Sequence, residues 1–185
     1  TEGVCFEADQ EEQERLRTLT GETVLPYALA ERCGEYNLYL TSNRANSSLL
    51  PPNHNFFNLY PESERMNIDE VVQCQCVTID SLYEKGILER CDFIKLDTQG
   101  SELAILRGGK QFLSDHALGM EVEVEFRQLY KNQPLFRDVD KYVSEELNME
   151  LVDLRHSYWK YSEGFGTGQR RGSIIFANAL YFRSP

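Results

Sequence analysis

The sequence has little positive charge and no long apolar run, and each shortage excludes a class of partner. Lysine and arginine number 19 against 30 aspartates and glutamates, which gives a formal net charge of -11 over 185 residues. A nucleic-acid or anionic-membrane partner requires a basic surface. No apolar stretch approaches the roughly 20 residues of a membrane span, and no signal-peptide pattern opens the chain. We therefore expect a soluble protein with neither a nucleic-acid nor a membrane partner.

Patterns typical of disulfides and metal sites are also missing. The five cysteines are an odd number without a disulfide-like layout, which favours a reducing compartment and leads us to expect a cytoplasmic protein. Cys74 and Cys76 form a Cys-x-Cys pair, but a zinc site needs a second pair or nearby histidines, and the three histidines are scattered. No metal site is predicted. In a strand, the two thiols would share one face and turn toward the core.

The composition predicts a single folded domain. With 41% hydrophobic and 26% charged residues the chain is typical of a globular protein, and its length suits one domain over residues 1–185. Short apolar runs interleaved with helical patterns predict an α/β fold with a mainly parallel sheet. Strands are expected over 3–7, 24–30, 36–40, 71–79, 93–97, 120–126, 149–154 and 173–182. Helices are expected over 11–19, over 80–88 with Asp80 as its cap, from 101 to a break at 108–109, and over 134–147.

Two acidic residues stand at the ends of expected strands. Glu7 ends the run Gly-Val-Cys-Phe-Glu, and Asp97 ends Phe-Ile-Lys-Leu-Asp. Ligands of open α/β sheets bind outside the carboxyl ends of the strands, where a carboxylate can accept hydrogen bonds from both ribose hydroxyls. Glu7 is the candidate for that role. The alternative is a solvent-exposed strand end that caps the next helix, although Asp9 is better placed to do so.

Lys95 and Asp97 lie two residues apart in an otherwise apolar strand. They therefore share one face of the strand, and both need partners because an unpaired buried charge is costly. One interpretation is a structural ion pair between them. The other is a polar site at the mouth of the sheet, where Gly100 lets backbone or ligand approach closely.

The same stretch, Phe-Ile-Lys-Leu-Asp-Thr-Gln-Gly-Ser-Glu, resembles the signature of FkbM-type methyltransferases. The resemblance spans nearly the whole chain and continues in Ser47-Ser48-Leu49-Leu50, Glu123-Val124-Glu125-Phe126 and Ala179-Leu180-Tyr181-Phe182. It implies a Rossmann-like fold that binds S-adenosylmethionine. It also implies methylation of a hydroxyl group on a sugar or natural-product-like small molecule.

The resemblance further implies roles for individual residues. Glu7 would hold the adenosyl ribose, and Ala28 and Leu29 would flank the adenine. Asp97 would sit beside the transferred methyl group and the acceptor hydroxyl. Because methyl transfer to oxygen needs a base for the hydroxyl proton, Asp97 is the predicted base or orienting group, with His54 as the reserve. The alternative for His54 is an ordinary loop histidine.

Three features qualify the resemblance. Many family members have Glu where this chain has Gln99, which argues against an acid role for that side chain. The polar loop over 41–58 would lie over the acceptor side as a lid or wall, with disorder as the alternative. The family's first strand and its glycine-rich turn should precede Glu7, between the Glu7 and Asp97 strands of the sheet. We expect this strand–helix unit, roughly 30 or more residues, to be absent from the chain.

Two other classes of function stay open. A nicotinamide-dependent oxidoreductase would also use an acid after its second strand, but it does not account for the block over 95–100. A non-catalytic binding or assembly domain would keep the fold and lose the cofactor.

Overall fold

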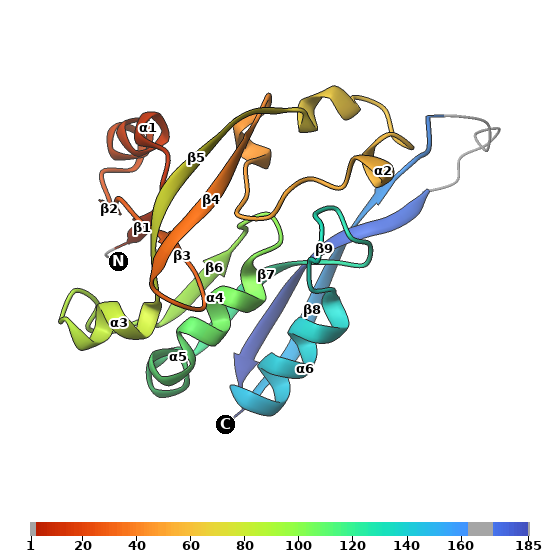
Figure 1. Cartoon of the computed structure of the whole chain (residues 1–185). Helices are drawn as coiled ribbons and strands as arrows, with labels where there is room; N and C mark the ends of the chain where they lie inside the picture. The colour runs from red at the N-terminus through yellow and green to blue at the C-terminus, as the bar shows by residue number, and fades with distance from the viewer. Residues whose placement is uncertain (1–2, 163–171, 185) are drawn as a thin grey trace.

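The computed structural model describes residues 3–162 and 172–184, and within them the strands form three sheets (Figure 1). The first pairs β1 (Val4–Phe6) with β2 (Thr23–Leu25). The second has the order β3 (Ala28–Leu29), β5 (Ile68–Val77), β4 (Gly34–Thr41). The third has the order β6 (Phe93–Leu96), β7 (Gly119–Glu125), β9 (Ser173–Arg183), β8 (Met149–Trp159). The chain is α/β, as predicted.

Parallel and antiparallel pairings are equally common in the described residues, so the expectation of a mainly parallel sheet is wrong. The pairs β1–β2, β3–β5 and β6–β7 are parallel, whereas β4–β5, β7–β9 and β8–β9 are antiparallel. Parallel neighbours need a crossover, which helices supply between β1 and β2 and between β6 and β7. Strands β8 and β9, which are neighbours in the order of elements, pair antiparallel.

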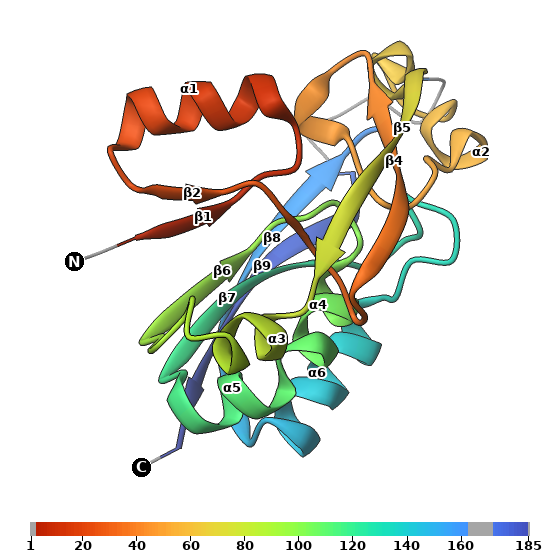
Figure 2. The same ribbon diagram turned by 60° about the vertical axis from the view of Figure 1, so that its left-hand side comes forward.

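The helices lie mainly on one side of the four-stranded sheet. They are α1 (Gln10–Thr20), α2 (His54–Phe57), α3 (Ile79–Glu84), α4 (Glu102–Gly108), α5 (Lys110–His116) and α6 (Phe136–Glu146), with 3-10 turns η1 (Arg44–Asn46) and η2 (Ser63–Met66). Figures 1 and 2 show α4, α5 and α6 on one face of that sheet, with α1 beside β1 and β2. Alternate residues of β7, Met120, Val122 and Val124, are fully buried against these helices. No helix in the described ranges is long and apolar enough to cross a membrane.

One predicted strand is divided in the structure. The apolar run over 24–30 forms β2 and β3, which belong to different sheets. Pro26 separates them because proline has no N–H to donate to a sheet and disfavours a continuous strand. The division sends the chain from the β1–β2 pair to the β3–β5–β4 sheet.

A predicted helix cap is also corrected. Thr78 caps α3, since its side chain accepts a hydrogen bond from the Ser81 N–H at 3.0 Å. Asp80 instead accepts from the Gln111 and Phe112 N–H groups at 3.2 and 2.9 Å. Those N–H groups belong to the first turn of α5, where helical donors have no partner within the helix. Asp80 therefore joins α3 to α5.

Strands β1 and β6 are edge strands in the described structure. Each has one hydrogen-bonded neighbour, β2 for β1 and β7 for β6. An unpaired edge leaves backbone N–H and C=O groups available for another strand. The family strand expected between β1 and β6 stays a prediction.

Candidate functional site

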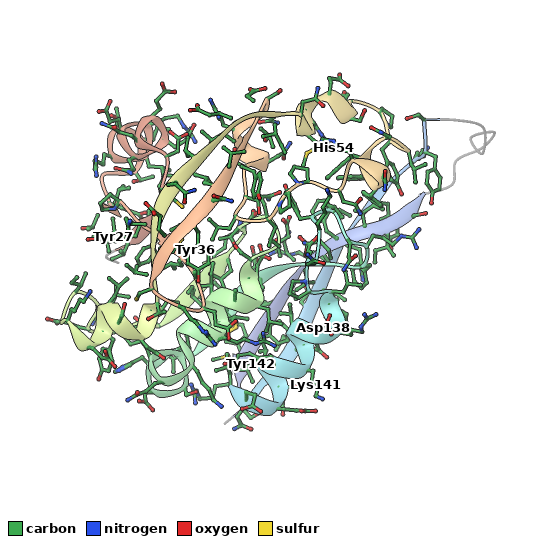
Figure 3. All side chains as sticks on the ribbon, in the orientation of Figure 1. Tyr27, Tyr36, His54, Asp138, Lys141 and Tyr142 are labelled. Atoms are coloured by element: carbon green, nitrogen blue, oxygen red, sulfur yellow. The ribbon has the colours of Figure 1, made fainter. Side chains whose placement is uncertain are left out.

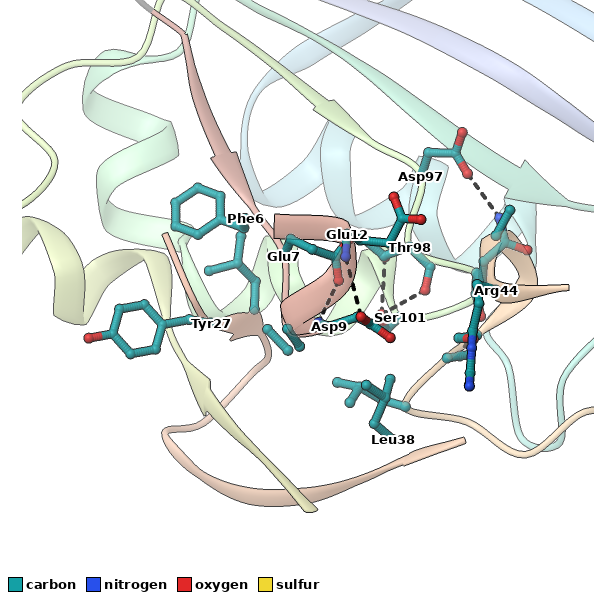
Figure 4. Close-up of a pocket in the computed structure, with 18 of the residues that line it drawn as sticks. Phe6, Glu7, Asp9, Glu12, Tyr27, Leu38, Arg44, Asp97, Thr98 and Ser101 are labelled. Atoms are coloured by element: carbon teal, nitrogen blue, oxygen red, sulfur yellow. Dashed lines mark hydrogen bonds between the residues drawn. The ribbon is translucent and has the colours of Figure 1, made fainter. Parts of the chain in front are cut away.

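A pocket of about 360 Å³ lies at the carboxyl-terminal ends of β1 and β6 (Figure 4). Its acidic wall contains Glu7, Asp9, Glu12 and Asp97, and its apolar wall contains Phe6, Tyr27, Ala28, Leu29, Leu38 and Leu40. All four residues predicted for the cofactor and the methyl group, Glu7, Ala28, Leu29 and Asp97, line this one pocket. The structure therefore brings them together although they lie 90 residues apart in the sequence.

Glu7 follows the last residue of β1 and is held at the mouth of the pocket by its neighbours. Its N–H donates to the Leu25 carbonyl at 3.1 Å, and its carboxylate Oε1 accepts from the Asp9 N–H at 2.8 Å. Asp9, not Glu7, caps α1, because its Oδ1 accepts from the Glu11 N–H at 2.8 Å. The capping alternative for Glu7 is therefore wrong. Burial raises the pKa of the Glu7 carboxyl.

The apolar wall is built from β3 and β4. Ala28 and Leu29 form β3, which pairs with Cys76 and Val77 of β5. Just after β3, the Ala30 N–H donates to the Val77 carbonyl at 3.0 Å. Alternation along β4 turns Leu38 and Leu40 to one face, which gives an apolar surface of the kind that an aromatic base can lie against.

Asp97 follows the last residue of β6 and contacts Gln99 rather than Lys95. The Gln99 side-chain Nε2 donates to Asp97 Oδ1 at 3.0 Å and lies 3.3 Å from Glu123 Oε2. Lys95 instead pairs with Glu121 of β7, with 3.6 Å between Nζ and Oε1. The predicted Lys95–Asp97 ion pair is therefore wrong, because the lysine reaches across to the neighbouring strand. Gln99 bridges the carboxyl groups of Asp97 and Glu123.

The turn after Asp97 is tightly held. Gln99 has a left-handed backbone with φ 57°, and Gly100 has φ 101°, a region where a side chain is strained. The carboxylate of Glu102, which is 2% exposed, accepts from the Thr98 and Gly100 N–H groups at 2.7 and 3.2 Å and from the Thr98 hydroxyl at 3.0 Å. The negative side chain therefore fixes the turn that carries Asp97 and Gln99 to the pocket.

The loop over 41–58 forms a wall of the site. Arg44, Ala45, Ser47, Ser48 and Leu49 line the pocket. The Ser48 hydroxyl donates to the Gln99 carbonyl at 2.7 Å. The Tyr130 hydroxyl lies 2.9 Å from both the Asn46 carbonyl and Gln99 Oε1. The disorder alternative for this loop does not apply, since these contacts tie it to the Asp97 turn.

Three carboxyl groups near the Asp97 turn, those of Glu102, Glu123 and Glu125, have raised pKa values. Burial, followed by the charges of Asp97 and Glu102, raises the pKa of Glu123 to about 8. Burial, followed by the charges of Glu102 and Glu123, raises the pKa of Glu125 well above its ordinary value, and burial raises that of Glu102. Strongly shifted carboxyl groups beside a pocket are typical of functional sites. Among the described residues no group of three or more His, Cys, Asp or Glu is arranged to hold a metal ion.

The structure does not bring His54 to the pocket. His54 begins α2 and is absent from the residues that line the cavity, and Figure 3 shows it well away from Tyr27. Its neighbours in α2, Phe56 and Phe57, are buried in a separate apolar cluster that includes Trp159. The ordinary-histidine interpretation fits this position.

Sequence reasoning missed Tyr130 and Arg44 as residues of the site. The alternation of Glu121, Glu123 and Glu125 along one strand places Glu123 on a charged face from the sequence alone. Tyr130 contacts Gln99 across 31 residues of chain, and no local pattern announces such a contact.

Comparison with protein families identifies one that this sequence matches. The sequence model of the Methyltransferase FkbM domain matches residues 2–151. The chain belongs to the FkbM methyltransferase family. This confirms the family resemblance. A search of curated proteins gives no match.

A solved structure of an FkbM methyltransferase, from Methylobacillus flagellatus KT, is similar to this chain. The TM-score is 0.48 with 16% sequence identity, and the match covers 98% of this chain and 36% of that chain. The chain thus spans little more than a third of the length of that FkbM methyltransferase.

Proposed function

We propose that this FkbM-family chain forms the nucleoside-binding and acceptor-binding side of an S-adenosylmethionine-dependent O-methyltransferase. The acceptor would be a hydroxyl group of a sugar or natural-product-like small molecule. The observation that carries the proposal is the single pocket that Glu7 and Asp97 line from different strands.

The residues present fit the nucleoside part of the cofactor. A partly buried carboxylate at the end of β1 can accept hydrogen bonds from two ribose hydroxyls, and Glu7 is held there by Leu25 and Asp9. Ala28, Leu29 and the facing residues of β4 offer apolar surface to a base. When bound, S-adenosylmethionine supplies an electrophilic methyl group on a positively charged sulfur.

Asp97 is the residue that we assign to the acceptor. Its carboxylate lines the pocket and is oriented by the Gln99 amide. A carboxylate in this position can accept a hydrogen bond from the acceptor hydroxyl, orient its oxygen, and take its proton as the carbon–oxygen bond forms. The 41–58 wall, fixed through Ser48 and Tyr130, would limit the size of the acceptor.

The test is a binding comparison by calorimetry. S-adenosylmethionine and NAD are titrated into the wild type, Glu7→Ala and Glu14→Ala. Glu14→Ala is the matched control, because Glu14 lies on α1, is exposed and does not line the pocket. We expect S-adenosylmethionine to bind the wild type and the control alike and Glu7→Ala about tenfold or more weakly, since a hydrogen bond to a charged group contributes about 1.5–3 kcal/mol.

Two results would contradict the proposal. Binding of NAD alone would identify a nicotinamide-dependent oxidoreductase. Binding of neither ligand would favour a non-catalytic binding or assembly domain.

A further inference from the structure

The carboxyl groups of Asp97 and Glu123 lie on neighbouring strands and contact the same amide nitrogen. Gln99 Nε2 is 3.0 Å from Asp97 Oδ1 and 3.3 Å from Glu123 Oε2. Asp97 lines the pocket, whereas Glu123 lies behind it, half-buried on β7. A change in charge on the pocket side therefore acts on Glu123 over a short distance.

The groups facing Glu123 are mostly acidic. Asp97 and Lys95 face it from β6, Glu102 from α4, and Glu125 lies two residues along its own strand. The residue of β9 that pairs with Glu123 is the neutral Asn178. Among the charges that act most strongly on Glu123, Lys95 is the cation, and it is already paired with Glu121.

Such a group of acids cannot all be ionised at low cost. Like charges a few ångströms apart in a buried site favour retention of a proton by one of them. Gln99 adds only an amide N–H between Asp97 and Glu123, which stabilises the pair without neutralising its charge. Burial raises the pKa of Glu123 to about 8 and that of Glu125 well above its ordinary value. Of these two acids, Glu123 is the one that shares the Gln99 amide nitrogen with Asp97, so it is the one that responds to charge in the pocket.

We infer that Glu123 is protonated in the ligand-free protein at neutral pH and releases its proton when a positively charged sulfonium ligand enters the pocket that Asp97 lines. The inference rests on the proposed function. The released proton passes to the buffer, and the positive charge of the sulfonium ligand then offsets the repulsion between the carboxylates of Asp97 and Glu123. S-adenosylhomocysteine carries an uncharged thioether, so it releases no proton from Glu123. The site thereby distinguishes the cofactor from its product by charge.

The direction of the pH effect follows from linkage. If the ligand lowers the pKa of Glu123, affinity rises with pH up to about 8, where Glu123 is already ionised in the free protein, and then levels off. A pKa lowered by about one unit corresponds to an affinity that rises about tenfold across this range. The α-amino groups of both ligands titrate in a similar range. The informative quantity is therefore the difference between the wild type and Glu123→Gln.

The experiment is calorimetry of S-adenosylmethionine and S-adenosylhomocysteine binding at pH 6, 7, 8 and 9, in buffers with low and high ionisation enthalpies. We compare the wild type, Glu123→Gln and Glu121→Gln. Glu121 is the matched control, because it lies on the same strand and pairs with Lys95 and Arg155. We expect wild type and Glu121→Gln to release more protons on binding S-adenosylmethionine than Glu123→Gln does, and all three proteins to agree for S-adenosylhomocysteine.

A carboxyl ¹³C titration of the ligand-free protein gives the second readout. We expect the Glu123 carboxyl to titrate well above its ordinary range in the absence of any ligand. If each ligand binds, but wild type and Glu123→Gln release the same number of protons on binding S-adenosylmethionine, this inference is overturned and the proposed function stays intact. Failure of both ligands to bind would overturn both. A Glu123 carboxyl that titrates in the ordinary range would overturn the inference by itself.

Discussion

Gly108 of α4 lies so close to Ala30 that a Cβ atom at Gly108 would stand 2.2 Å from the Ala30 carbonyl oxygen. Ala30 directly follows β3, whose residues Ala28 and Leu29 line the pocket. The missing side chain at Gly108 thus allows the helix and the apolar wall of the pocket to approach each other. The obstacle is backbone rather than a flexible side chain, so it cannot move aside cheaply.

Gly108→Ala should destabilise the protein. In an exposed helix the same change would stabilise by about 1 kcal/mol, because alanine is the better helix former. Here the clash with Ala30 should reverse the sign and lower the free energy of unfolding by about 1–3 kcal/mol. Urea unfolding followed by circular dichroism measures the change. A free energy of unfolding that rises in the variant would contradict the close approach.

Gly100→Ala should cost more than Gly86→Ala. Both glycines have positive φ, 101° and 66°, so both substitutions introduce backbone strain. A Cβ atom at Gly100 would also lie 2.9 Å from the Gln133 side-chain nitrogen, whereas a Cβ atom at Gly86 would have no neighbouring atom within 4 Å. We expect a loss of about 1 kcal/mol at Gly86 and a larger one at Gly100. Equal losses in denaturant unfolding would show that Gln133 adapts freely.

Asp97→Asn should lower turnover much more than cofactor affinity. The asparagine oxygen can still accept from Gln99, so the turn is retained, but it cannot take a proton. Loss of a general base typically reduces the rate about 10²–10⁴-fold. The measurement is S-adenosylhomocysteine formed in the presence of a panel of hydroxylated sugars. Asp92→Asn, just before the other end of β6, is the control, and wild-type turnover in Asp97→Asn would remove Asp97 from the mechanism.

The stability of the protein should fall as pH rises toward 8, partly because of Glu123. Its pKa is about 8 in the folded protein against 4.5 as the ordinary value, so the folded state binds more protons between these limits. The contribution of the Glu123 proton to the free energy of unfolding is therefore complete below about pH 4.5, and it is lost as pH rises through 8. Glu123→Gln should flatten the curve by up to several kcal/mol, since each unit of pKa difference corresponds to about 1.4 kcal/mol, measured by urea unfolding from pH 5 to 9. An unchanged slope in the variant would contradict the raised pKa.

The sequence predicts most of the individual elements because their patterns are local. The alternation of Met120, Val122 and Val124 identifies β7, and Asp9 identifies the start of α1 from its position alone. The break between α4 and α5 likewise follows from two adjacent glycines. Such signals act over a few residues, and tertiary structure does not override them here.

Features that depend on distant partners could not be predicted in this way. Lys95 was expected to pair with Asp97, but register places Glu121 of β7 opposite it. Asp80 was expected to cap its own helix, yet it reaches α5, 31 residues further along the chain. Within the site, the positions of Glu7 and Asp97 follow from strand ends, whereas Tyr130 enters only through the folded loop.

The hydrogen bonds of Ser48 and Tyr130 join the wall formed by the 41–58 loop to Gln99, which in turn bridges Asp97 and Glu123. A substrate large enough to displace that wall would also displace the Gln99 side chain and weaken its hydrogen bonds to Asp97 and Glu123. The size of the substrate and the protonation of the two acids would then depend on the same hydrogen bonds. A bulky alcohol would be rejected both by lack of room and by a disturbed base.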